Sequence, residues 1–378
     1  MPRDTSAPVA QRLVHVVESL DVGGLERMVL SLAAWQAARG AAVRIICLFH
    51  EGAWAGEARA RGLDVVGIGK QRGLDLHALR RLRIALRPWR PDVLHTHNAV
   101  AHYYTAAASL GLDRARMVNT RHGMGEAGGG RRLDALYRLS MRRADVAVAV
   151  CQAACRRFVA TGAFAPAKAA VVRNAADIAR APVRNAAARE RLLMSLGRPS
   201  HAMVVGAVGR LSAIKNHALL LRAARLVRQR GQAIELVIVG DGPERASLQS
   251  MATALQIGDC VHLVGWRDDV ASLLAGFDVL AMPSRSEGYS LAMVEAAAAA
   301  LPLVATAVGG NPEIVQQGKT GLLVPDDDAP ALADALARLA SDVGLRERLG
   351  DAARQWALAH AGLDAMGHAY AALYEGRR

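Results

Sequence analysis

Two carboxylates, Glu287 and Glu295, lie eight residues apart in the segment 284–313, which reads SRSEGYSLAMVEAAAAALPLVATAVGGNPE. The first belongs to a polar loop, and the second falls in the first turns of an Ala-rich helix. The loop places Gly288, Ser290 and Leu291 at the start of this helix, where free backbone N–H groups and the helix dipole favour an anion. A carboxylate accepts hydrogen bonds from hydroxyl groups. The segment therefore indicates a ligand with both phosphate and hydroxyl groups, such as a nucleotide sugar.

Two cations follow another apolar run, residues 204–208. Arg210 stands at the end of this predicted strand, and Lys215 comes five residues later in GRLSAIKNH. Arginine offers a planar fork of donors to phosphate and lysine a point charge. Taken alone, these residues are as well explained as solvated surface cations. Both cations follow a strand end, however, and the helix start at Gly288 to Leu291 favours anions. Together these features make a diphosphate site the stronger interpretation.

The first half of the chain adds a glycine turn, Gly23-Gly24, within DVGGLE after the apolar run 13–17. Glycines after a strand let the backbone approach a ligand closely. The pattern is not GxGxxG, so a dinucleotide fingerprint is absent and a plain tight turn is the alternative.

Histidines form the last set of candidate residues. His122 precedes Gly123 at the end of the predicted strand 117–120, where an imidazole can contact a sugar hydroxyl or a phosphate, although a lone histidine is more often structural. His95 and His97 share one face of another strand, but no carboxylate ligands lie nearby, so we expect no metal site.

Regular elements must position these residues, and their pattern repeats along the chain. Short apolar runs alternate with helical segments, first over residues 13–173 and again from 204, which predicts parallel sheets with ligands at the carboxyl ends of the strands. We expect an α/β protein with two doubly wound, Rossmann-like domains facing across a cleft. The predicted domains are residues 1–180 and 195–358, and a final helix at about 360–378 is expected to pack back on the first domain.

The net charge of +13 lies entirely in the first 180 residues, which hold 27 Lys and Arg against 14 Asp and Glu, while the remainder is neutral. Only 4% of residues are aromatic, which argues against a surface that stacks nucleic-acid bases. Arginine-rich helices at 74–90 and 131–143 are either solvated faces or contacts to an anionic membrane.

The N-terminal sequence has no apolar stretch typical of a signal peptide, and the chain has no apolar run of 18 residues. The four cysteines show no pattern of a disulfide framework. We therefore expect a cytoplasmic protein, in peripheral contact with the inner face of the membrane if it contacts a membrane at all.

In combination these motifs resemble those of retaining glycosyltransferases of family four, which have the GT-B fold. Glu287-x7-Glu295 is similar to the EX7E signature of that family. The other motifs occur in the family's order, and they are Gly23-Gly24 with Glu26, His122-Gly123, Asn174 to Asp177, Gly209-Arg210 with Lys215, Gly240 to Pro243, and Gly309 to Glu313. The resemblance covers nearly the whole chain.

The resemblance implies a role for each matching residue. Arg210 and Lys215 would neutralise the donor diphosphate, Glu287 would hold hydroxyls of the donor sugar and Glu295 the ribose. Backbone amides at Gly288, Ser290 and Leu291 would meet phosphate. Gly23 and Gly24 would let the first domain approach the diphosphate, and His122 would touch the donor sugar or its phosphate. No metal or other cofactor is implied.

The sequence departs from the family pattern at two places. Ala175 and Ala300 stand where the family commonly has glycine.

The expected function is transfer of a sugar, with retention of configuration, from a nucleoside diphosphate to a glycan or a lipid-linked acceptor such as a polyprenyl lipid, in surface polysaccharide or glycolipid synthesis. Two alternatives are a sugar-nucleotide epimerase of the same fold and a catalytically silent binding protein. No nucleic-acid partner is expected.

Overall fold

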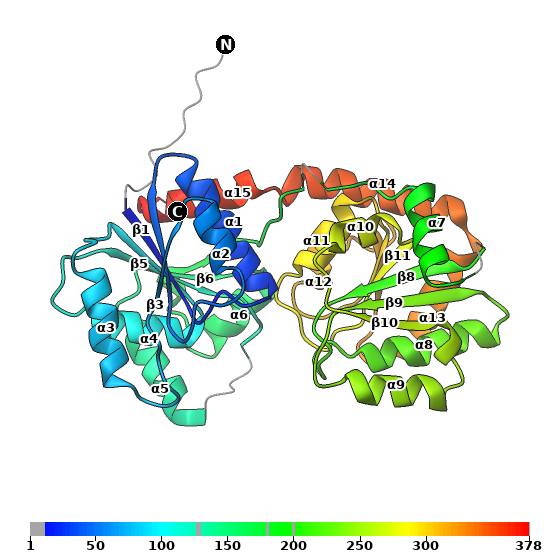
Figure 1. Cartoon of the computed structure of the whole chain (residues 1–378), viewed down its shortest axis with the longest axis horizontal. Helices are drawn as coiled ribbons and strands as arrows, with labels where there is room; N and C mark the ends of the chain where they lie inside the picture. Colours follow the sequence, from blue (N-terminus) through cyan, green and yellow to red (C-terminus); the bar gives the residue numbers. More distant parts are fainter. Residues whose placement is uncertain (1–11, 126–129, 179–180, 199–200, 378) are drawn as a thin grey trace, which may run out of the picture. The chain divides into compact units, whose positions relative to one another are not determined.

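The structure is a computed structural model that describes residues 12–125, 130–178, 181–198 and 201–377, without the side chains of residues 130–132. The chain divides into two compact units (Figure 1). The N-terminal unit comprises residues 1–175 with 363–378, and the C-terminal unit comprises residues 176–362.

The N-terminal unit is built on a parallel sheet with the strand order β3-β2-β1-β4-β5-β6-β7. Its strands are β1 (Arg12–Val17), β2 (Ala42–Cys47), β3 (Asp64–Gly67), β4 (Val93–His97), β5 (Arg116–Arg121), β6 (Val146–Ala149) and β7 (Ala169–Val171). Its helices are α1 (Gly24–Ala37), α2 (Ala55–Ala60), α3 (Leu76–Leu86), α4 (Asn98–Ala108), α5 (Gly130–Ser140), α6 (Gln152–Ala160) and α15 (Leu363–Tyr374). A one-turn 3-10 helix, Pro166–Lys168, precedes β7.

The last helix of the chain, α15, packs against α1 in this unit (Figure 1). The indole N–H of Trp35 donates a hydrogen bond of 2.6 Å to Asp364. Gly367 lies so close to the Trp35 ring that a Cβ would come within 2.5 Å of it. The rings of Tyr370 and Tyr374 on α15 lie 4.8 and 5.7 Å from that of His95 on β4, and both tyrosines are nearly inaccessible to solvent.

The C-terminal unit has a second parallel sheet, in the order β10-β9-β8-β11-β12-β13. Its strands are β8 (Met203–Val208), β9 (Ile234–Val239), β10 (Val261–Gly265), β11 (Val279–Met282), β12 (Leu303–Thr306) and β13 (Gly321–Val324). Its helices are α7 (Ala186–Ser195), α8 (His217–Gln229), α9 (Arg245–Ala254), α10 (Val270–Ala275), α11 (Leu291–Ala298), α12 (Asn311–Ile314), α13 (Ala329–Ser341) and α14 (Val343–His360), with a 3-10 turn at Gly258–Cys260. A large apolar core joins α8 and α13 to the sheet.

Each sheet reverses its strand order once, between β1 and β4 in the N-terminal unit and between β8 and β11 in the C-terminal unit. At such a switch point the loops that follow the two neighbouring strands diverge, which leaves a place for a ligand at their carboxyl ends. The predicted fold class, two Rossmann-like α/β domains, is confirmed.

The structure corrects one detail of the predicted helix at 74–90. The helix begins at Leu76 because the Asp75 side chain accepts a hydrogen bond from the Ala78 N–H and caps the first turn. Leu82 and Leu86 are buried, but Leu74 and Leu76 are 77% and 67% exposed and do not belong to the core. Within the described residues, no helix combines the length and apolar character needed to cross a bilayer.

Candidate functional site

The switch point of the C-terminal unit brings Lys215 and Glu287 together. Lys215 follows β8 and Glu287 follows β11, and these strands are neighbours in the sheet although the two residues are 72 positions apart. The Lys215 ammonium lies 2.6 Å from Oε2 of Glu287, and the Ser284 hydroxyl donates to the same oxygen at 3.1 Å. Both side chains are largely buried, with 22% and 12% of their surfaces exposed. A partly desolvated ion pair at this edge can open to bind a ligand. The lysine can then pair with an anionic group and the carboxylate can accept hydrogen bonds from hydroxyl groups.

A glycine turn fixes the backbone of Glu287. Gly309 has a φ of +51°, and a Cβ at this position would lie 1.9 Å from the Glu287 carbonyl oxygen. The next residue, Gly310, donates its N–H to that oxygen at 3.1 Å. The turn after β12 therefore supports the loop that carries the carboxylate, and its close contact and positive φ require glycine at position 309.

Helix α11 begins directly after the loop that carries Glu287 and Gly288. Ser290 caps the helix by accepting a hydrogen bond from the Met293 N–H, and the helix begins at Leu291. The amides of Leu291 and Ala292 have no acceptor within the helix, as at every helix N-terminus. Glu295 lies one turn further along and is half-buried.

Arg210 lies at the end of β8, and the loop that follows it borders a small pocket of the same unit. Arg210 is exposed and directly follows the β8 end at Val208 and Gly209. A pocket of about 280 Å³ is lined by Ser212, Ala213, Asn216, His217, Ala218, Arg222, Glu244, Leu248 and Arg285. Asn216 adopts a φ of 50° and starts α8 directly after Lys215, which sharpens the turn of the loop there.

In the N-terminal unit, Gly23 and Gly24 form the start of α1, after β1. Glu26 folds back over this helix end, and a Cβ on Gly23 would come within 2.2 Å of its carboxylate. Burial raises the pKa of Glu26, while its own backbone N–H opposes this shift. The Glu26 carboxylate therefore lies at the helix N-terminus at which the sequence predicts an approach to diphosphate.

His122 is half-buried beside the ends of β4 and β5. Its ring stacks on His97 with centroids 5.2 Å apart, and its Nε2 lies 3.0 Å from Nδ1 of His97. Its backbone N–H donates to the Asn98 side chain. Desolvation lowers the pKa of His122 to about 3, against a raising contribution from Asn174. At neutral pH this residue is therefore a neutral hydrogen-bonding group and not a cation.

Sequence reasoning missed several residues near the switch point between β1 and β4 in the N-terminal unit. His15 on β1 lies in register with His95 on β4, and strand register cannot be read from one sequence. Glu18 directly follows β1, and burial raises its pKa against the lowering effects of Lys70 and Arg121. An acid with a raised pKa at a strand end is typical of binding and catalytic sites. Its position directly after the apolar run 13–17 was the only signal in the sequence.

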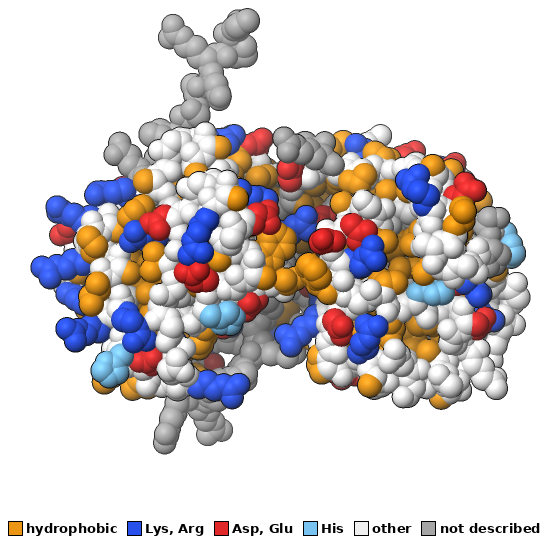
Figure 2. All heavy atoms as spheres, viewed as in Figure 1, with side chains coloured by type: hydrophobic (Ala, Val, Ile, Leu, Met, Phe, Trp, Pro, Cys, Tyr) orange, Lys and Arg blue, Asp and Glu red, His pale blue; other side chains and the backbone are white. Residues whose placement is uncertain are grey.

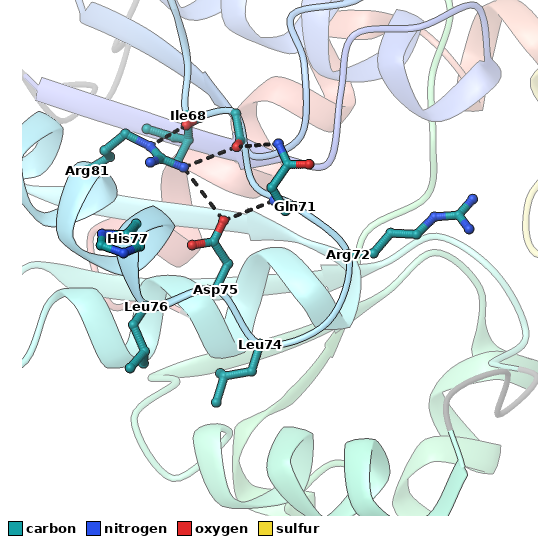
Figure 3. A pocket seen from close by; sticks show the side chains of 9 residues that line it. Ile68, Gln71, Arg72, Leu74, Asp75, Leu76, His77 and Arg81 are labelled. Carbon is teal, nitrogen blue, oxygen red and sulfur yellow. Dashed lines mark hydrogen bonds and ion pairs between the residues drawn. The ribbon is translucent and has the colours of Figure 1, made fainter.

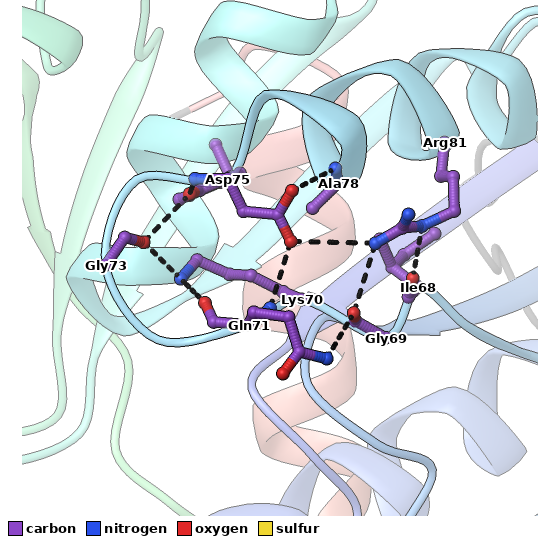
Figure 4. A network of polar contacts seen from close by, with 9 residues as sticks. Ile68, Gly69, Lys70, Gln71, Gly73, Asp75, Ala78 and Arg81 are labelled. Atoms are coloured by element: carbon purple, nitrogen blue, oxygen red, sulfur yellow. Dashed lines mark hydrogen bonds and ion pairs between the residues drawn. The ribbon is translucent and has the colours of Figure 1, made fainter.

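A surface pocket lies on the N-terminal unit at the start of α3 (Figure 3). It has a volume of about 630 Å³, and the loop that borders it, residues 69–75, is braced by polar contacts (Figure 4). Asp75 accepts from the Gln71 N–H, and the buried Lys70 ammonium donates to the carbonyls of Gln71 and Gly73. Leu74, Leu76 and Arg72 line the pocket at its exposed rim.

Comparisons with known proteins agree with this geometry. The family described as Glycosyltransferase Family 4 matches residues 22–180, and the family described as Glycosyl transferases group 1 matches residues 202–342. The D-inositol 3-phosphate glycosyltransferase of Corynebacterium jeikeium is 37% identical over 190 residues, which are 48% of this chain and 45% of that protein. The N-acetyl-alpha-D-glucosaminyl L-malate synthase of Bacillus anthracis is 28% identical over 270 residues, 70% of this chain and 69% of that protein. The matched segment thus spans about half the length of relatives such as the first.

Solved structures share the fold over almost the entire chain. Anabaena HepE in complex with UDP superimposes with a TM-score of 0.85 at 21% identity, covering 97% of this chain and all of that one. Sucrose-phosphate synthase of Thermosynechococcus elongatus gives a TM-score of 0.79 at 20% identity, with 97% and 98% covered. From the two family matches and the shared architecture, we conclude that the chain belongs to the family 4 glycosyltransferases of the GT-B fold.

Proposed function

We propose that this protein is a retaining glycosyltransferase that moves a sugar from a nucleoside diphosphate to a glycan or lipid-linked acceptor, in surface polysaccharide or glycolipid synthesis. The observation that carries the proposal is the Lys215–Glu287 pair at the switch point of the C-terminal unit. A cation and a carboxylate held together there offer one partner to a diphosphate and the other to sugar hydroxyls.

In the proposed reaction, donor binding separates the pair. Lys215 and Arg210 take the diphosphate, with the amides at the start of α11, and Glu287 accepts hydroxyls of the donor sugar while Glu295 accepts those of the ribose. The acceptor oxygen attacks the anomeric carbon on the face from which the diphosphate departs. The bond to the diphosphate breaks, and a diphosphate oxygen takes the acceptor proton. The protein has to stabilise the charge that develops on the leaving group, which two cations and a helix N-terminus achieve without a metal ion.

The acceptor is proposed to bind to the N-terminal unit. Lys and Arg side chains gather at the edge of this unit that carries α3 (Figures 1 and 2). Leu74 and Leu76 are exposed beside them, and Ile84 on α3 is 61% exposed. Apolar side chains among arginines suit an acceptor held at an anionic membrane surface. The side chains of Arg131 and Arg132, which belong to the second predicted basic helix, lie outside the described residues.

A screen of nucleotide sugars by thermal shift tests the proposal. UDP- and GDP-linked hexoses, with UDP and GDP alone, are the probes, because neighbours and relatives are described with UDP and with GDP-mannose. We expect one donor to raise the melting temperature of the wild-type chain more than that of Lys215→Ala. The acceptor panel includes glycans, polyprenyl phosphates, inositol phosphate and malate, since two relatives are named for the last two.

The products separate the proposed activity from the alternatives. An α-linked product from an α-linked donor supports retention, and an inverted product would contradict it. An epimerase would change the donor sugar without an acceptor. A silent binding protein would bind a nucleotide sugar and leave it unchanged with every acceptor.

A further inference from the structure

The Glu287 carboxylate has a second donor besides Lys215, and that donor is buried. Ser284 follows β11 and Pro283 and is inaccessible to solvent. Its hydroxyl donates to Oε2 of Glu287 at 3.1 Å and makes no other hydrogen bond within the described part of the chain. The Lys215 ammonium contacts the same oxygen at 2.6 Å. Both donors therefore hold the carboxylate by one of its two oxygens.

The other oxygen of Glu287, Oε1, is open to a ligand. Neither Lys215 nor Ser284 contacts it, and no other described residue donates a hydrogen bond to it. Buried side-chain atoms that lack a hydrogen bond occur at other described residues, but Oε1 is not among them, so solvent reaches it. Because Oε2 is held, the direction of Oε1 is fixed as well.

Buried polar contacts from the neighbouring strand keep Ser284 in place. The Thr306 hydroxyl, at the end of β12, donates to the Ser284 carbonyl at 2.5 Å. The Asn311 amide in turn donates to the Thr306 carbonyl at 3.0 Å. All three residues are inaccessible to solvent, so water does not compete for these contacts. The Ser284 hydroxyl is therefore presented from a fixed position.

A serine in a loop often serves the backbone as a helix cap or in a turn. Ser290 in the same loop does so, since it caps α11. The Ser284 hydroxyl, in contrast, bonds to no backbone group of the described residues. The loop is held through its carbonyls instead, by Thr306 at Ser284 and by the Gly310 N–H at Glu287. The loop therefore keeps its conformation without the Ser284 hydroxyl, whose partner is the carboxylate.

Opening of the ion pair makes this second donor important. In the proposed function, the diphosphate draws Lys215 away from Glu287, and a largely buried carboxylate is left without its cation. Such a group is unstable unless a hydrogen-bond donor remains. We propose that Ser284 is a positioning residue for Glu287, whose hydroxyl keeps Oε2 in place when the pair opens and thereby directs Oε1 to the hydroxyls of the donor sugar. This role rests on the proposed function, but the contact can be tested without a ligand.

Hydrogen exchange of β11 in the full chain measures the contact. Lys215→Ala and Ser284→Ala each leave Oε2 with one donor, and the double variant leaves it with none. We expect the double variant to raise the opening equilibrium constant of β11 at least about tenfold beyond the product of the two single effects. The same cycle in a Glu287→Gln chain, which lacks the charge, should be additive within about twofold. Additive effects with Glu287 present would overturn the proposal.

Calorimetric titration of UDP, with GDP as the parallel probe, measures the opened pair. Ser284→Ala should weaken binding of the diphosphate about tenfold, because Glu287 loses its last donor when Lys215 leaves. UMP and GMP, which have no diphosphate to draw Lys215 away, should bind the variant as they bind the wild type. Ser284→Cys, with a weaker donor of similar size, should give an intermediate affinity for the diphosphate. An unchanged affinity of Ser284→Ala for the diphosphate, or an equal loss for mono- and diphosphates, would contradict the proposal.

Thr320→Val is the matched control. The Thr320 hydroxyl is also buried and lies in the same unit, but it bonds to backbone groups of Ile314 and Gln316. Its loss should leave the affinities for UDP and UMP unchanged. A loss as large as that of Ser284→Ala would show that any buried hydroxyl of this unit has the same effect, and the assignment to Ser284 would fall.

Sugar transfer from deoxygenated donors tests the direction of Oε1. The probes are UDP-glucose and its 2-, 3- and 4-deoxy forms, with the matching GDP-mannose series. Ser284→Ala should lower kcat about tenfold with the complete sugar and have no further effect with the deoxy donor that lacks the hydroxyl bound by Glu287. The same loss with every deoxy donor would contradict the positioning role.

The outcomes separate this proposal from the proposed function. If the wild type binds neither diphosphate and transfers no sugar, the proposed function fails and the positioning role fails with it. If the wild type is active and Ser284→Ala matches it, the positioning role fails alone.

Discussion

The two sheets share one architecture but present different chemistry at their switch points. In the C-terminal unit, the loops after β8 and β11 hold a cation and a carboxylate in contact, Lys215 and Glu287. In the N-terminal unit, the corresponding position after β1 and β4 is surrounded by neutral histidines, whose pKa values burial lowers. The same backbone frame therefore holds an ion pair in one unit and, in the other, buried neutral histidines beside the acidic side chains of Glu18 and Glu26.

This difference indicates a division of tasks. In the proposed function, the cations and the helix N-terminus of the C-terminal unit would stabilise the leaving-group charge. The neutral imidazole of His122 in the N-terminal unit would add a hydrogen-bonding contact to the donor without adding charge. Of the four predictions below, the first two test this difference, and the last two test how the backbone of the C-terminal unit supports its site.

Mild acid should destabilise the N-terminal unit more than the C-terminal unit. The folded state keeps His15 and His102 neutral down to a pKa of about 4, while unfolded histidine titrates at 6.5. Between pH 6.5 and pH 4 the unfolded chain binds more protons than the folded chain. The stability that these neutral histidines provide above pH 6.5 is therefore lost as the pH falls. Each such histidine contributes up to about 1.4 kcal/mol per pH unit.

Five histidines of the N-terminal unit have lowered pKa values, compared with His217 among the described residues of the C-terminal unit. Hydrogen exchange followed by mass spectrometry at pH 7.5 and pH 5 measures the two units separately. Strands β1 and β4 should lose protection at pH 5 while β8 and β11 keep theirs, and equal losses would show that the units do not differ in this respect.

Lys215→Ala should lower turnover about 100-fold, because it removes a cation from the leaving group. The measurement is the initial rate of sugar transfer at saturating donor. Lys319→Ala, which removes an exposed lysine of the same unit, is the control and should retain full activity. Turnover near that of the wild type in Lys215→Ala would remove Lys215 from the proposed mechanism.

Gly309→Ala should destabilise the C-terminal unit by at least about 1–2 kcal/mol, since alanine is strained at positive φ. Its Cβ would also press on the Glu287 carbonyl, 1.9 Å away, so KM for the donor should rise as well. Thermal unfolding and donor kinetics measure the two effects. An unchanged KM would mean that this turn does not support the Glu287 loop.

Ala300→Gly should have the smallest effect, although Ala300 also has a positive φ, of 61°. Relief of about 1–2 kcal/mol of backbone strain is offset by the lost burial of a methyl group, about 0.8 kcal/mol, and by the greater chain entropy of glycine. We expect a change in unfolding free energy within about 1 kcal/mol of zero. A loss as large as that of Gly309→Ala would show that positive φ alone does not govern these two positions.

Much of the fold could be predicted because its strands are continuous apolar runs. The segments 13–17 and 204–208 each end in glycine-containing turns, which marks the carboxyl edge of a parallel sheet. Strand β13 was not predicted, although β11 and β12 have the same length of four residues and were. Of the two positions where glycine was expected, Ala300 has a positive φ and Ala175 does not, and only the backbone can distinguish them.

The candidate site was predicted as a set of residues and not as a set of contacts. The sequence placed Lys215 and Glu287 at strand ends, but only the strand order makes β8 and β11 neighbours. The contacts among the buried histidines depend on register, since His15 meets His95 and His97 only through the pairing of β1 with β4. The hydrogen bond from Gln36 on α1 to Tyr374 on α15 joins residues more than 300 positions apart, and neither residue carries a motif.

The central claim, that the ion pair opens to bind a diphosphate, is tested most directly by calorimetric titration of UDP and UMP into wild-type and Lys215→Ala chains, with GDP and GMP as the parallel pair. We expect the wild type to bind one diphosphate at least about tenfold more tightly than its monophosphate, which corresponds to 1.4 kcal/mol. Lys215→Ala should lose that preference and keep its affinity for the monophosphate. Equal binding of the diphosphate by both chains would contradict the claim.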